Sequence, residues 1–89
     1  MRLDVWLNKV CLTKSRSQAK AGCRGGHVLL ESRSVKESHE LSGGELLLLR
    51  EGDREREVRV LAIPAGNVSR KEARDYYEIV AERSARAMP

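Results

Sequence analysis

Residues 13–30 read TKSRSQAKAGCRGGHVLL, a basic segment that begins like a capped helix and ends in two glycines and an apolar run. Ser15 and Gln18 have the spacing of a capping box, in which a hydroxyl and an amide bond the first free N–H groups of a helix. Gly25 and Gly26 stand where the helix must stop, because glycine adopts the left-handed conformation without penalty. Since so short a helix is marginal alone, we expect it to pack on the rest of the chain.

We expect another helix N-terminal to this segment. Its apolar residues follow the i, i+3, i+4, i+7 pattern of an amphipathic helix: Leu3, Trp6, Leu7 and Val10. Trp6 belongs to this stripe, so we interpret it as a core anchor rather than a base-stacking platform. Small side chains on the basic helix, Ala19 and Cys23, would let the two helices approach closely.

Positive charge gathers on these two helices. Arg16, Lys20 and Arg24 recur every four residues and therefore share one face. The tandem helices thus predict a basic ridge made of Arg2, Lys9, Lys14, Arg16, Lys20 and Arg24. The free N–H groups near Ser15, between Lys14 and Arg16, would suit a phosphate. The alternative to a phosphate site is that Ser15 and Gln18 only cap the helix and that the charges are ordinary surface charges. This alternative accounts for Ser15 and Gln18 but not for the excess of cations.

Beyond the glycines the pattern changes to that of short strands. We expect strands at residues 27–30, 34–36, 46–49 and 57–63, with turns at residues 31–33 and 51–54. Ser69 and Glu72 form a second capping box, and an apolar stripe predicts a C-terminal helix over residues 70–83: Ala73, Tyr76, Tyr77 and Val80. The prediction is an α+β fold with two short N-terminal helices on a small, mostly antiparallel sheet of about four strands, plus a C-terminal helix.

Length and charge narrow the class of protein. The 89 residues allow one small domain, which we place at residues 1–67, with the C-terminal helix and tail of residues 68–89 packed on it. The net charge of +4 is unevenly distributed, because residues 1–36 hold eight Lys/Arg against two acids. This asymmetry indicates a surface that binds a polyanion. Aromatic residues make up only 3%, which favours phosphate contacts and RNA shape over base stacking.

Several other functions are not indicated. The sequence contains no GxGxxG, Walker or HExxH motif, so we expect neither an enzyme nor a bound cofactor. Cys11 and Cys23 lack CxxC spacing, and His27 and His39 do not complete a ligand cluster, so we expect no metal. The two cysteines are interpreted as small buried apolar side chains. No apolar run would span a bilayer and no signal peptide opens the chain, so we expect a cytoplasmic protein.

The order of motifs resembles the alpha-L RNA-binding family, first known from ribosomal protein S-four. The resemblance covers residues 2–50 and rests on these motifs: Arg2-Leu3-Asp4, Trp6-Leu7, Ser15-Arg16-Ser17-Gln18-Ala19, Gly26-x-Val28, Val35-Lys36, Ser38, Leu41 and Gly44-Glu45. The remainder is similar to small stand-alone members, the ribosome-associated heat-shock protein and its short relative in bacterial ribosome quality control. That part of the resemblance rests on Leu49-Arg50-x-Gly52, Val58-x-Val60-x-Ala62-Ile63, Lys71-Glu72-Ala73 and Tyr77-Glu78.

The resemblance implies a role on stalled large ribosomal subunits, with contacts to ribosomal RNA and peptidyl-tRNA that support nascent-chain rescue or tailing. The implied RNA-contacting positions are Arg2, Lys9, Lys14, Ser15, Arg16, Gln18, Lys20 and Lys36, to which the charged helix face adds Arg24. We expect a monomer with no membrane or small-molecule partner. Two alternatives stay open: an assembly factor that binds ribosomal or transfer RNA, and a protein-interaction adaptor that uses Tyr76 and Tyr77.

Gly44-Glu45 stands where the family usually has Gly-Asp. The chain departs from the family pattern in two further places. Ser32-Arg33 replaces the usual Asn-Gly of the turn after the first expected strand, although Asn-Gly favours a tight turn with positive φ. Cys23 replaces a large aliphatic residue late in the second helix, and Gly25 adds a flexible position. Neither change alters the basic face.

Overall fold

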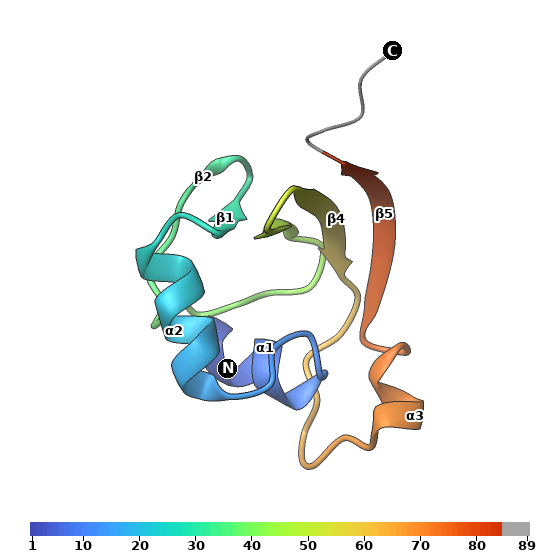
Figure 1. Ribbon diagram of the computed structural model, residues 1–89. Coiled ribbons are helices and arrows are strands. Elements are labelled where there is room, and N and C mark those ends of the chain that lie inside the picture. Colours follow the sequence, from blue (N-terminus) through green and yellow to red (C-terminus); the bar gives the residue numbers. More distant parts are fainter. Residues whose placement is uncertain (85–89) are drawn as a thin grey trace.

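The computed structural model describes residues 1–84, which form a sheet of five strands with helices on one side (Figure 1). The helices are α1 (Leu3–Lys9), α2 (Arg16–Arg24) and α3 (Arg70–Ala73). The strands are β1 (Val28–Leu30), β2 (Arg33–Ser34), β3 (Leu46–Glu51), β4 (Arg54–Val60) and β5 (Tyr77–Ser84). All neighbouring strands are antiparallel, in the order β2-β1-β3-β4-β5. The predicted α+β class and the two N-terminal helices are confirmed, with one strand more than expected.

The local signals of α2 act as predicted. The Ser15 Oγ accepts a hydrogen bond from the Gln18 N–H at 3.0 Å, so the helix begins at its cap. The helix ends at Arg24, and Gly26 then adopts a positive φ of 76°. This left-handed residue turns the chain into β1.

The C-terminal helix expected over residues 70–83 is wrong beyond Ala73. The predicted cap exists, since the Ser69 Oγ accepts from the Glu72 N–H at 3.2 Å. The helix lasts only one turn, however, and the chain then forms β5 along the outer side of β4. Without β5, β4 would be the edge of the sheet and its outward N–H and C=O groups would lack partners in the protein. The residues of β5, with Tyr77, Ile79 and Val80 at its start, have high β propensity and supply those partners.

One residue of β5 lies outside the regular pairing. Glu57 pairs with Ala81 and Val58 pairs with Ile79, so Val80 is an extra residue at a β-bulge. Beyond the bulge, Arg83 bonds Glu57 at 2.8 Å across the strands. The outer end of the β4–β5 pair is therefore joined by charged side chains rather than by the core.

The turn between β1 and β2 is tight despite the missing Asn-Gly. Leu30 pairs with Arg33, which leaves Glu31 and Ser32 as a two-residue loop. Both adopt positive φ, 50° and 65° respectively. These are the signs of φ that a type I′ turn requires, and Asn or Gly adopts them more readily than Glu or Ser.

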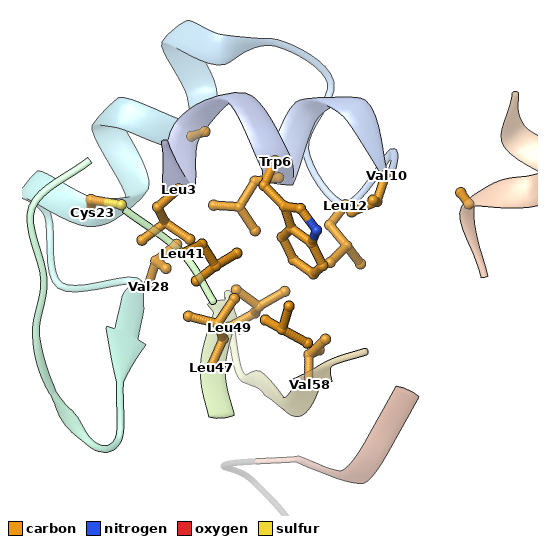
Figure 2. Close-up of a cluster of buried hydrophobic side chains, with 14 residues drawn as sticks. Leu3, Trp6, Val10, Leu12, Cys23, Val28, Leu41, Leu47, Leu49 and Val58 are labelled. Carbon is orange, nitrogen blue, oxygen red and sulfur yellow. The ribbon is translucent and has the colours of Figure 1, made fainter. Parts of the chain in front are cut away.

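The core lies between the helices and the sheet, with Trp6 at its centre (Figure 2). Trp6 is fully buried, and its Nε1–H donates to the Ala62 carbonyl at 3.1 Å. Leu47 and Val58 approach from the strands in Figure 2. The interpretation of Trp6 as a core anchor is confirmed: its apolar ring is buried and its N–H has a hydrogen-bond partner.

The two cysteines differ. Cys23 is buried in the core, as expected. Burial, followed by the charges of Glu37 and Asp4, raises the pKa of its thiol to about 11. The expectation of a buried side chain is wrong for Cys11, which is exposed at the end of α1 with a φ of 61°.

Candidate nucleic-acid interface

Asp4 organises the N-terminal end of the basic surface. Its side chain is fully buried, in the first turn of α1. Arg2 donates from Nε to Oδ1 at 3.1 Å and from Nη2 to Oδ2 at 3.2 Å, while the Arg16 Nη2 lies 3.6 Å from Oδ2. The two arginine side chains remain 42% and 54% exposed. One buried carboxylate therefore orients two guanidinium groups, from two helices, whose remaining donors face solvent.

The ionised form of Asp4 is stabilised in this position. Burial by itself would raise the pKa of the carboxyl group. The hydrogen bond and charge of Arg2, the backbone N–H of Val5 at 2.9 Å and the charge of Arg16 outweigh burial and lower the pKa below its usual value. At neutral pH the site is thus a carboxylate between two cations, with a net positive charge.

A second group of cations surrounds Glu37, in the loop after β2. Arg24 donates to the Glu37 Oε1 at 2.9 Å. The N–H of Glu37 itself, then Arg24 and the charge of Lys20, lower the pKa of this carboxyl group. The Glu37 carbonyl accepts the Asp4 N–H at 3.1 Å, which ties this loop, with the exposed Lys36, to α1.

The start of α2 carries the polar members of the predicted site. Gln18 Oε1 accepts the Lys14 N–H at 2.6 Å, so its amide reaches one residue further back than in a usual capping box. The side chains of Ser15 and Gln18 both serve the cap. The exposed side chains of Lys14 and Arg16 stand on either side of Ser15 along the chain.

Lys9 lies apart from the other predicted residues. Its Nζ is 3.4 Å from the Gly66 carbonyl, at the opposite end of α1 from Arg2. A helix rises 1.5 Å per residue, which separates these two positions by about 10 Å. The structure thus brings together a set that we call the α1–α2 basic surface: Arg2, Arg16, Lys20, Arg24 and Lys36.

Two cations missed by the sequence reasoning lie near Lys14. Arg70 and Arg74, from α3 and its C-cap, line one hollow with Lys14 and Tyr77. Their i, i+4 spacing was visible in the sequence, but neighbouring acids gave residues 64–89 a net charge of only +1. Lys14 and Arg70 are 56 positions apart in the sequence, so no local pattern indicates that they line the same hollow.

Two other kinds of feature, a metal site and a membrane-spanning helix, are absent from the described residues. No group of three His, Cys, Asp or Glu residues within 1–84 is arranged to hold a metal ion. No helix in that part of the chain is long and apolar enough to cross a membrane. What residues 1–84 do present is a set of exposed guanidinium and ammonium groups on a rigid two-helix support.

The comparison with protein families and curated proteins agrees with the motif order. Residues 1–47 match the model of the S4 domain. The chain is 33% identical to a heat shock protein 15 homolog of Haemophilus influenzae and 35% identical to one of Aeromonas salmonicida, over 88% of its length in each case. It spans about three fifths of the length of these two curated relatives, 60% and 59%.

Solved structures agree over most of the chain. Heat Shock Protein 15 of Vibrio cholerae, described as trimeric, superimposes with a TM-score of 0.84 at 30% identity, covering 91% of this chain and 82% of that one. The solution structure of the hypothetical protein HP1423 gives a TM-score of 0.77 at 34% identity, covering 91% of this chain and 98% of that one.

Proposed function

This chain belongs to the S4 domain family, and from that premise we propose that it binds folded RNA through the α1–α2 basic surface and catalyses no reaction. The observation that carries the proposal is the buried Asp4 carboxylate, which holds the partly exposed Arg2 and Arg16 side by side. Paired guanidinium groups of fixed orientation suit phosphate oxygens, which accept two N–H donors at once. Phosphate contacts of this kind position a protein on RNA without base stacking.

The proposed target is the stalled large ribosomal subunit, where the protein would contact ribosomal RNA and peptidyl-tRNA. The resemblance to small stand-alone members of the family supports this target, as does the similarity to heat shock protein 15. We propose the cytoplasm as its location and a monomer as its acting unit. Sedimentation velocity tests the latter, since the Vibrio cholerae relative is described as trimeric.

The first test removes single cations from the α1–α2 basic surface. Arg16→Ala and Lys20→Ala should each weaken binding to purified large-subunit ribosomal RNA across sequences and flatten the salt dependence by about one unit. Asp4 keeps Arg2 as a partner in the first variant, so both proteins should stay folded. Lys71→Ala, which removes an exposed cation outside the α1–α2 basic surface, is the matched control. Unchanged affinity and salt slope in both variants would refute the proposed surface.

The second test addresses the target. In sucrose gradients of a lysate with stalled ribosomes, the protein should sediment with large subunits that carry peptidyl-tRNA. Sedimentation with small subunits or free RNA would favour an assembly factor instead. An adaptor that presents Tyr76 and Tyr77 has little support, because both tyrosines pack partly against the core.

A further inference from the structure

Two neighbouring hollows lie where α3 meets β5. One hollow lies between residues 8–14 and α3, and a second lies over the β4–β5 pair. The two hollows are neighbours, because Arg74 and Tyr77 line both, and together they make one surface. We call it the α3–β5 groove and define it by its cations and its tyrosine: Lys14, Arg56, Arg70, Arg74 and Tyr77. In Figure 1, α3 faces the loop that joins α1 to α2.

Three of the four cations of this groove differ from most others in the described part of the chain. The side chains of Lys14, Arg70 and Arg74 make no ion pair or hydrogen bond with any residue in 1–84. By contrast, Arg24 and Arg83 each bond a carboxylate. The unpaired groups of the groove are therefore available to a ligand.

The acids near the groove leave it positive. Arg56 lies 3.6 Å from Glu51, and Glu82, at the far end, is held by Arg54 at 3.1 Å. The other carboxylates close by in sequence, Glu72 and Asp75, do not line either hollow. Arg70 and Arg74 are one helical turn apart, a spacing at which like charges repel. A bound polyanion would relieve that repulsion.

The groove begins where the α1–α2 basic surface ends. Lys14 lines the groove. Arg16, two residues further along the chain, belongs to the α1–α2 basic surface. We propose that the α3–β5 groove binds the phosphate backbone of the same RNA, so that the RNA contacts the protein on both sides of the start of α2. This inference rests on the proposed function. RNA fits better than an acidic peptide because its charges continue along one backbone that can follow both surfaces.

The test compares two variants in filter binding to purified large-subunit ribosomal RNA. The double variant Arg70→Ala/Arg74→Ala should flatten the salt slope by about two units and weaken binding by about tenfold per lost contact at 0.1 M salt, because each phosphate contact releases about one counterion. Lys71→Ala removes a cation from the same turn that lines neither hollow, and it should bind within about twofold of the unchanged protein. Lys14→Ala repeats the test outside α3, and thermal unfolding verifies that each variant is folded.

Three outcomes overturn the groove. If Arg16→Ala loses affinity while the Arg70→Ala/Arg74→Ala variant keeps it, the proposed function stands without the groove. A loss of binding free energy in Lys71→Ala equal to half of that in the double variant, which removes two charges, would show a general charge effect. Retained RNA affinity with lost binding of poly-glutamate would assign the groove to an acidic protein instead.

Discussion

Replacing Asp4 by asparagine tests the centre of the proposed RNA surface, because it removes one buried charge and almost no volume. The carboxylate accepts two hydrogen bonds from Arg2 and one from the Val5 N–H, and it faces Arg16 at 3.6 Å. The asparagine Oδ1 can still accept the Arg2 Nε–H and the Val5 N–H, but the amide nitrogen that replaces Oδ2 can only donate and no longer accepts from Arg2 Nη2. The variant therefore loses the negative charge that faces the two arginines, and the shape of the core stays the same.

The expected loss of stability follows from these contacts. Removing one partner of a buried ion pair costs about 3–5 kcal/mol when the remaining charge stays buried. Here the arginines are 42% and 54% exposed and can turn toward water, so the loss should be smaller. A hydrogen bond to a charged group contributes about 1.5–3 kcal/mol, and we expect a decrease of about 2 kcal/mol in the free energy of unfolding. For a domain of this size that lowers Tm by about 10 °C.

The dependence on pH has a definite sign. Because the pKa of Asp4 is lowered in the folded protein, its contribution is fully present above the unfolded pKa of about 3.9 and disappears as the pH falls through the folded pKa. Urea unfolding should thus show a constant difference between the two proteins from about pH 5 to 8, which narrows below about pH 4. Equal stability at pH 7, or a difference that does not narrow in acid, would contradict the assigned role of the ion pairs.

RNA binding provides an independent check on the same substitution. Asp4→Asn raises the net charge by one, so a purely electrostatic view expects tighter binding. We expect weaker binding instead, because Arg2 and Arg16 lose the group that orients them. Glu78→Gln, at an exposed position of β5, changes the net charge equally and serves as the control. An affinity gain in Asp4→Asn that equals the gain in Glu78→Gln would refute the orienting role.

Two further predictions concern stability and thiol chemistry. Ser32→Gly should raise the free energy of unfolding by about 1 kcal/mol, because Ser32 adopts a φ of 65° that glycine takes without strain; a lower urea midpoint would count against the turn geometry. Cys11 should react with a maleimide in the folded protein at pH 8 whereas Cys23, whose pKa is about 11, should react only after unfolding; equal rates would be inconsistent with the burial of Cys23.

The signals that predicted structure correctly act within a few residues. The cap at Ser15, the stop at Gly26 and the cap at Ser69 each depend on groups within four residues of one another. The apolar stripe of α1 is equally local. The same kind of signal misled at β5, because Tyr77 and Val80 satisfy a helical period as well as they suit a strand. Pairing with the open side of β4 decides in favour of a strand. Because β4 is distant from β5 in the sequence, no local pattern indicates this pairing.

The chain's order of residues by itself determined the two basic helices, the α+β class and the cations that share a face on α2, since spacing along a helix places side chains directly. Only the tertiary structure decided how those cations are used. It buried Asp4 between Arg2 and Arg16, and it brought Arg70 and Arg74 beside Lys14. Both arrangements depend on how separate segments pack, and packing depends on the shape of the whole core rather than on any local period.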